Sequence, residues 1–244
     1  MGSNLANIGL ILGVTALVRP LDVRARVVWR EMPLMLLVTL ALYPLAWDGV
    51  LSRGDGVLLL FALVAYLIFV FYSVEDEAPE ILGEYEEFMK ESDRTTSLVS
   101  GTDVLWVIAG SVCLVLGGIC IVEGAVEIAS SLGISEVVIG LTVVAVGTSL
   151  PELATSLVAA LRSEADIAVG NVIGSNIFNV AAILGTASVV SPLAIPSHVL
   201  TRELVVVVAM SLLLFPILRT RWRIRRWEGA LLLACYVGAV TWLL

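Results

Sequence analysis

The chain has 244 residues, of which 59% are hydrophobic and only 15% charged, with a mean hydropathy of +1.01 and a formal net charge of −8. Soluble domains carry more charge and fewer apolar residues, so this composition excludes an ordinary soluble enzyme or binding domain. The apolar residues lie in runs of about 20, the length of a helix that crosses a bilayer, and an all-α polytopic membrane protein is expected.

Eight transmembrane spans are predicted in chain order, near residues 1–18, 31–47, 57–73, 103–129, 135–161, 166–190, 199–218 and 227–244. The connections between them are short except for residues 74–102. This connection divides the chain into an incomplete first half of three helices, residues 1–73, and a complete second half of five helices, residues 103–244.

Lys and Arg residues fall unevenly on the two sides if these spans alternate. Twelve lie on the side of the long connection, and only Arg53 and Arg202 lie on the other. Because cytoplasmic loops are rich in Lys and Arg, the connection is expected to be cytoplasmic and the C-terminus outside, in a plasma or inner membrane.

The long connection accounts for most of the net charge, with nine carboxylates between Glu75 and Asp93. This charge density is typical of a solvated linker. A regulatory cation site is the alternative, although the carboxylates lack the spacing and the turn glycine of a calcium-binding loop.

The first residues of the chain recur in its second half, which indicates an internal repeat. An offset of 172 pairs Gly2 with Gly174, Ser3 with Ser175, Asn4 with Asn176 and Asn7 with Asn179. The match continues through the Pro-Leu pair at residues 20–21 and 192–193.

The fifth predicted span contains Glu152, an ionisable residue at a depth where such residues are rare and usually functional. Thr148 and Ser149 precede it by four and three residues, so all three share one face of a helix. Pro151 has no amide hydrogen, so it disrupts the helix and frees carbonyl groups of the preceding turn. Freed carbonyls at this depth require a cavity, an ion or neighbouring protein.

The sixth predicted span repeats this pattern, because Ser175 and Asn179 also lie four residues apart on one helical face. Together the two spans offer a carboxylate, hydroxyls, amide oxygens and backbone carbonyls, which are the donors that Na⁺, Ca²⁺ and Mg²⁺ prefer. Neither Cys nor His joins them, which argues against zinc or copper. The alternative is a proline kink with serines bonded back to the helix and one paired glutamate.

The stretch VVIGLTVVAVGTSLPELATSLVAA, followed by DIAVGNVIGSNIFNVAAILG, resembles the second alpha-repeat of the cation/calcium antiporter superfamily, most closely its prokaryotic sodium/calcium exchanger-like branch. With the repeat at residues 2–21, the resemblance extends over essentially the whole chain. It implies a ten-helix fold of two inverted five-helix halves, with ion sites at the midplane between broken helices.

The resemblance also implies a set of cation ligands from both halves. They are Thr148, Ser149, Glu152, Ser175, Asn179 and the Ala145 carbonyl from the second half, with Ser3 and Asn7 from the first.

The first half departs from the family pattern at its start. About 70 residues of the second half precede Gly174, whereas only Met1 precedes Gly2, so the first copy of G-T-S-x-P-E and its glutamate are missing. The chain is therefore expected to be an N-terminally shortened antiporter with eight of the ten helices. An in-frame upstream extension carrying that motif would favour the full antiporter.

The function expected first is secondary antiport of Ca²⁺, or a similar hard divalent cation, against Na⁺ by alternating access. A Ca²⁺/H⁺ exchanger is one alternative. Another is an inactive protein or partner subunit that carries only half of the ion site. Vesicles that contain only this chain would then show no sodium-driven calcium uptake. A single midplane site without a repeated ring of ligands disfavours a passive pore.

An enzyme is not expected, because no nucleophile–base pair or phosphate-binding loop is found in the sequence. The expected partners are the lipid bilayer and the transported Na⁺ and Ca²⁺ ions, with neither a cofactor nor nucleic acid.

Overall fold

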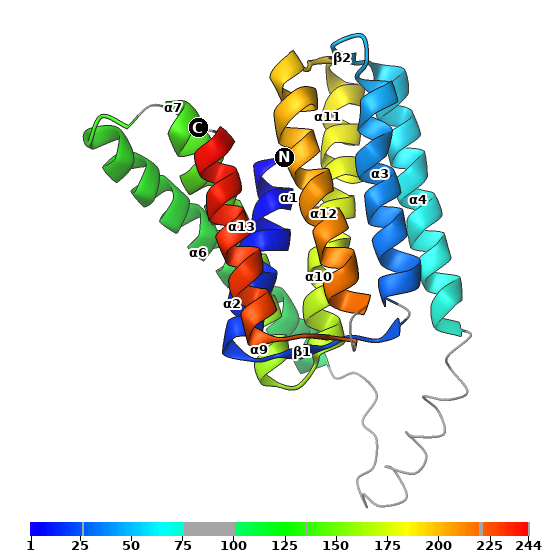
Figure 1. Ribbon diagram of the computed structural model, residues 1–244, viewed down its shortest axis with the longest axis vertical. Coiled ribbons are helices and arrows are strands. Elements are labelled where there is room, and N and C mark those ends of the chain that lie inside the picture. The colour runs from blue at the N-terminus through cyan, green and yellow to red at the C-terminus, as the bar shows by residue number, and fades with distance from the viewer. Residues whose placement is uncertain (26, 76–100, 135, 220–221, 244) are drawn as a thin grey trace, which may run out of the picture.

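The computed structural model describes residues 1–25, 27–75, 101–134, 136–219 and 222–243. Apolar helices form its framework (Figure 1), which confirms the all-α polytopic fold class. The first half contains α1 (Gly2–Ala6), η1 (Asn7–Ile11), α2 (Leu12–Val18), η2 (Val27–Glu31), α3 (Met32–Leu45) and α4 (Arg53–Glu75).

The second half contains more helices, because α6 to α9 precede the segment that repeats the start of the first half. They are α6 (Gly101–Ser131), α7 (Glu136–Ile139), η3 (Gly140–Val144), α8 (Ala145–Thr148), α9 (Leu150–Leu161), α10 (Ala165–Phe178), η4 (Asn179–Leu184), α11 (Gly185–Val190), η5 (Val199–Glu203), α12 (Leu204–Arg219) and α13 (Arg226–Leu243). The η segments are π-helical turns that continue directly into the neighbouring α-helices.

Each of the eight predicted spans coincides with helical structure in the described residues. Five helices are long and apolar enough to cross a membrane, and a sixth candidate results if the bent pair Thr142–Thr148 and Leu150–Leu161 counts as one span. Gly2–Val18 is a shorter apolar helix. The number of eight crossings therefore stays a prediction.

The long connection separates α4 from α6. Because α4 ends at Glu75 and α6 begins at Gly101, the predicted connection 74–102 is helical at both ends, and its residues 76–100 lie outside the described residues. The assignment of residues 1–73 and 103–244 as two unequal halves likewise stays a prediction.

The internal repeat is visible in local structure. The π-helical turns η1 and η4 begin at Asn7 and Asn179, which the sequence offset of 172 pairs. The turns η2 and η5 end at Glu31 and Glu203, which the same offset pairs. Equivalent residues therefore adopt equivalent and uncommon backbone conformations.

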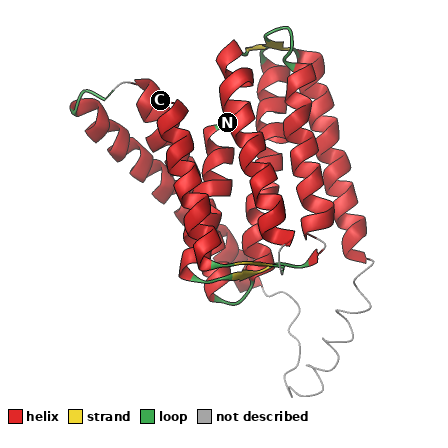
Figure 2. Ribbon diagram, in the orientation of Figure 1, coloured by secondary structure: helices red, strands yellow, loops and turns green. Residues whose placement is uncertain are grey.

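Two short antiparallel sheets tie the halves together at opposite ends of the bundle (Figure 2). Strand β1 (Leu21–Asp22) pairs with β4 (Arg223–Ile224), and β2 (Val50–Leu51) pairs with β3 (Leu193–Ala194). Each sheet thus joins a strand of the first half to a strand of the second.

Glycines permit close backbone packing at two helix crossings, each between a helix of the first half and one of the second. A Cβ atom at Gly56 of α4 would lie 2.7 Å from the carbonyl oxygen of Gly185, and one at Gly229 of α13 would lie 2.8 Å from that of Gly13. Both distances are shorter than real Cβ contacts allow, and the obstructing atoms belong to the backbone. Small residues at these crossings allow the helix backbones to approach as helices do in membranes.

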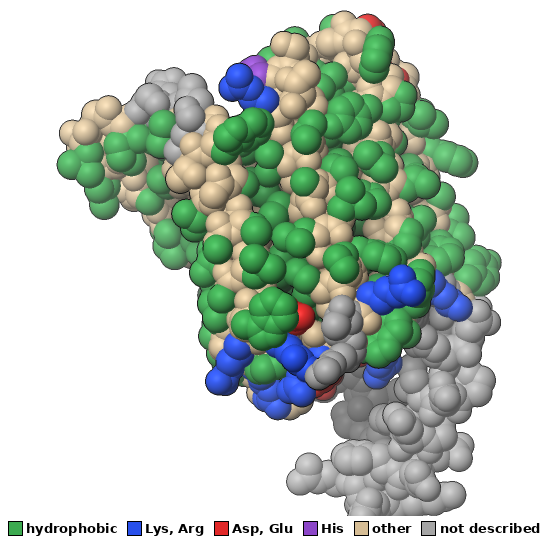
Figure 3. Space-filling view, viewed as in Figure 1, with side chains coloured by type: hydrophobic (Ala, Val, Ile, Leu, Met, Phe, Trp, Pro, Cys, Tyr) green, Lys and Arg blue, Asp and Glu red, His purple; other side chains and the backbone are tan. Residues whose placement is uncertain are grey.

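The outer face of the bundle is largely hydrophobic, whereas Lys and Arg gather mainly at the end that carries β1 and β4 (Figure 3). At this end Arg223 pairs with Asp22 at 3.2 Å, and the Arg219 guanidinium lies 5.3 Å from the ring centre of Trp29. An apolar belt with cations at one end is the surface of a protein that crosses a bilayer.

Candidate cation-binding site

The helix that carries Glu152 is broken immediately before it. Helix α8 ends at Thr148 and α9 begins at Leu150, and the two parts of this segment are bent by 48°. The Ser149 amide donates to the Val146 carbonyl at 3.0 Å instead of to the Ala145 carbonyl four residues back. Pro151 has no amide hydrogen to donate, so the break follows from the sequence as predicted.

Glu152 lies between two cavities that flank α10. One, of about 710 Å³, is bounded by α6, α8, α9 and α10, and the other, of about 420 Å³, is bounded by α4, α9 and the α10–η4 helix. Ser175 lines both cavities together with Glu152. Thr148 lines the larger cavity and Asn179 the smaller. No described residue forms an ion pair with the Glu152 carboxylate.

The two halves of the chain meet beside the break. The hydroxyl oxygens of Ser3 and Ser149 lie 3.1 Å apart, although 146 residues separate them in the chain. The Asn179 amide donates to the Ser3 hydroxyl at 3.2 Å. Three residues proposed as ligands by resemblance are thereby brought into one hydrogen-bonded chain.

Two equivalent hydrogen bonds join the repeated asparagines. The Asn7 amide donates to Oδ1 of Asn176 at 3.0 Å, and the Asn179 amide donates to Oδ1 of Asn4 at 2.9 Å. The offset of 172 converts one bond into the other. One bond joins η1 to α10 and the other joins η4 to α1, so the continuous helices α1–η1 and α10–η4 are held together by the same contact made twice.

Asn7 has an unsatisfied oxygen. Its side chain is completely buried, and its Oδ1 atom accepts no hydrogen bond in the described structure. Leaving such an acceptor unpaired costs about 1–3 kcal/mol. A bound cation would satisfy it, which fits the ligand role that the resemblance implies.

Ala145 begins α8, one turn before Thr148, and the displaced hydrogen bond of Ser149 fits the use of its carbonyl as a ligand. The structure thus places all eight residues of the expected ligand set on the helices around the break. Their coordination of an ion stays a prediction.

Three further residues, which hold the helices of the site in place, were not predicted from the sequence. Asn171 donates to the Glu152 carbonyl at 3.2 Å and to the Ser156 hydroxyl at 3.0 Å, which links α10 to α9. Asn4 and Asn176 accept the twin bonds described above. Asn171 belongs to the G-N pair at residues 170–171, and Asn4 and Asn176 belong to the repeated G-S-N motif. Polar residues inside an apolar helix were the signal available in the sequence.

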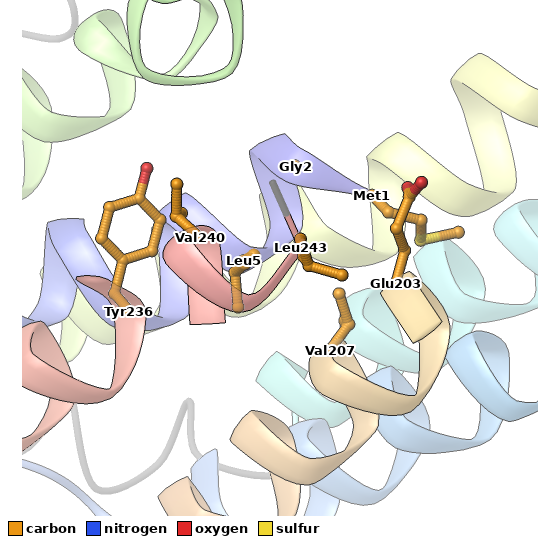
Figure 4. A pocket seen from close by; sticks show the side chains of 8 residues that line it. All are labelled: Met1, Gly2, Leu5, Glu203, Val207, Tyr236, Val240 and Leu243. Atoms are coloured by element: carbon orange, nitrogen blue, oxygen red, sulfur yellow. The ribbon is translucent and has the colours of Figure 1, made fainter. Parts of the chain in front are cut away.

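A third pocket lies at the start of α1 and is mainly apolar. Figure 4 shows Glu203 on η5 beside Met1, with Leu5, Val207 and Tyr236 among the other lining residues. Glu203 also lies 3.7 Å from the exposed His198. Glu152 does not line this pocket, so it is separate from the two cavities above.

Comparison with known proteins places this site in a family. Residues 1–72 and 102–244 match the model of the sodium/calcium exchanger protein family. The chain belongs to the sodium/calcium exchanger family. The match includes both halves of the chain and every residue of the candidate site.

Individual relatives agree with this membership. The chain is 39% identical to the putative antiporter CaxA of Alkalimonas amylolytica, over 98% of this chain and 75% of the relative. It is 37% identical to the uncharacterized membrane protein MJ0091 of Methanocaldococcus jannaschii, over 98% of this chain and 74% of the relative. Its structure matches that of the sodium-calcium exchanger NCX_Mj soaked with 10 mM Na⁺ and zero Ca²⁺, with a TM-score of 0.72, 32% identity, and 98% and 74% of the two chains covered. The chain therefore spans about three quarters of the length of these proteins.

Proposed function

We propose that this exchanger-family protein binds Ca²⁺, or a similar hard divalent cation, at the break before Glu152 and exchanges it for Na⁺ by alternating access. One observation carries the proposal: Glu152 lines two cavities in a membrane-spanning bundle, and no described residue pairs with its charge. An ionisable side chain in such a place is costly unless it serves an ion pathway.

The surrounding donors suit the proposed substrates. Hydroxyl oxygens of Ser3, Thr148, Ser149 and Ser175 and amide oxygens of Asn7 and Asn179 are hard ligands, as is the Ala145 carbonyl. Na⁺ and Ca²⁺ would use the same oxygens and the same carboxylate, so the two ions would exclude each other. Mutual exclusion at one site, opened to each side in turn, is sufficient to couple their opposite movements.

The proposed orientation follows from charge. The end of the bundle that carries β1 and β4 holds Arg223 and the Arg219–Trp29 contact, and it is assigned to the cytoplasm of a cell or inner membrane. The opposite end, with β2 and β3, would face outside, as would the C-terminus.

The test measures equilibrium binding of radioactive calcium to the purified chain in lipid nanodiscs. Saturable binding that Na⁺ displaces is expected, and Glu152→Gln should abolish it, since the substitution removes the charge and keeps the shape. Glu164→Gln is the matched control, because Glu164 is an exposed carboxylate that lines neither of the two cavities beside Glu152. Calcium binding that survives in Glu152→Gln would overturn the proposal.

Sodium-driven calcium uptake into proteoliposomes then tests exchange. Uptake that requires Glu152 would support antiport by this chain. Binding without uptake would instead favour the half-site alternative, in which this chain supplies ligands and another segment or subunit completes the pathway.

A further inference from the structure

The larger cavity beside Glu152 contains a second carboxylate, on a different helix. Glu123 of α6 and Glu152 of α9 both line it. They are the only ionisable residues among the described residues that line it. The cavity therefore carries two acidic groups and no basic group, a balance that matches one divalent cation.

Helix packing fixes the level of Glu123 along the cavity. A Cβ atom at Gly147 would collide with Val122, the residue before Glu123, and a Cβ atom at Gly118 would lie 3.7 Å from Pro151. Helix α6 thus packs against the broken segment, with the residue before Glu123 in contact with Gly147. Glu152 is one helical turn beyond Thr148 in the same wall.

Glu123 lies within an otherwise apolar helix. Gly101–Ser131 is a candidate membrane span, and the neighbouring Ile119 and Ile121 are exposed on its surface. Glu123 is eight residues before the end of this helix, about 12 Å at 1.5 Å per residue. Glu123 is itself an exposed residue, and no described residue pairs with it. An ionisable side chain within a membrane span is costly unless it serves an ion pathway.

We propose that Glu123 is a second binding carboxylate of this exchanger, which holds a divalent cation in the cavity together with Glu152 and so favours Ca²⁺ over Na⁺. The inference rests on the proposed function. A second negative charge attracts a doubly charged ion twice as strongly as a singly charged one at the same distance. Loss of Glu123 should therefore weaken Ca²⁺ binding much more than Na⁺ binding.

The neighbouring Glu127 provides a matched control. It lies one turn further along α6 and is exposed, as Glu123 is, but it does not line the cavity. A general effect of removing negative charge from α6 would appear in both Glu123→Gln and Glu127→Gln, whereas a ligand effect would appear only in the first.

The experiment titrates the whole chain in nanodiscs with Ca²⁺, and with Na⁺ in competition, for the unmodified protein, Glu123→Gln, Glu127→Gln and Glu152→Gln. In Glu123→Gln the Kd for Ca²⁺ should rise about tenfold or more, and the inhibition constant for Na⁺ should change less than about threefold. Glu127→Gln should match the unmodified protein. Glu123→Asp should recover part of the lost affinity, which a misfolded variant would not do.

The outcomes separate the two proposals. If Glu123→Gln binds Ca²⁺ as Glu127→Gln does while Glu152→Gln loses binding, the role of Glu123 is overturned and the proposed function stands. An equal loss of Ca²⁺ and Na⁺ binding, without recovery in Glu123→Asp, also overturns it. If the unmodified chain binds no Ca²⁺, both proposals fail.

Discussion

Ser3 and Ser149 lie with their hydroxyl oxygens 3.1 Å apart, so the start of α1 touches the break between α8 and α9. Ser3 belongs to the first half of the repeat and Ser149 to the second. The contact thus joins the two halves at the residues whose oxygens the proposed ion would use.

Cysteines at these two positions should form a disulfide, because the side-chain atoms are already near the required separation. The variant Ser3→Cys with Ser149→Cys would be made after Cys113, Cys120 and Cys235 are replaced by alanine. A protease site placed in the connection 76–100 lets the crosslink be measured on a gel, since only a disulfide then keeps the two fragments together. The bond should also abolish calcium binding by removing two ligands.

The control for this crosslink pairs Ser3→Cys with Ser188→Cys. Ser188 is a buried serine of α11 that donates to its own helix, so it should not react with position 3. Equal crosslinking of both pairs would mean that α1 does not occupy the described position.

The twin asparagine bonds should both contribute to stability, but unequally. Asn176→Ala removes the acceptor of the Asn7 amide, and Asn4→Ala removes the acceptor of the Asn179 amide. Asn176→Ala should lower the free energy of unfolding by about 1–3 kcal/mol, because the buried Asn7 amide loses its partner. Asn4→Ala should lower it less, because the half-buried Asn179 amide keeps its hydrogen bond to Ser3. Thermal unfolding in detergent measures the effect.

Thr201→Ala is the comparison for these two variants, since the Thr201 hydroxyl is exposed and bonds to the carbonyl of Ser197 in its own segment. It should change the unfolding temperature little. If Thr201→Ala lowered the unfolding temperature as much, the asparagine bonds would contribute no more to stability than an exposed hydroxyl bond does.

Alanine at Gly56 or Gly229 should separate packed helices. The new Cβ atoms would lie 2.7 Å and 2.8 Å from backbone oxygens, which cannot move aside as a flexible side chain can. Overpacking of this kind costs about 1–3 kcal/mol and should lower the unfolding temperature. Gly238→Ala, on the same helix as Gly229, has no heavy atom within 4 Å and should be tolerated.

The orientation of the bundle can be tested with single cysteines in the cysteine-free protein. Arg223→Cys, beside the β1–β4 sheet, should react with a membrane-impermeant maleimide only after the cells are opened. Asp48→Cys, just before β2, should react in intact cells, because it lies at the opposite end. The reverse pattern would invert the proposed topology while leaving the fold unchanged.

The sequence by itself determined the helices, the break and the repeat. Long apolar runs require helices in a bilayer, and Pro151 cannot donate the hydrogen bond that would continue its helix. The identities at an offset of 172 predicted that Asn7 and Asn179 would be equivalent, and both begin a π-helical turn. Each of these inferences depends on local chemistry or on comparison of the chain with itself.

Only the tertiary structure decided which helical faces meet. Helical periodicity places Ser175 and Asn179 on one face, but it does not say that Asn179 bonds to Asn4 and Ser3. The role of Glu123 could not be predicted from the sequence either, because there it is one of two glutamates near the end of an apolar span. Its place in the same cavity as Glu152 depends on how α6 packs against Gly147, and such packing is set by contacts between residues far apart in the chain.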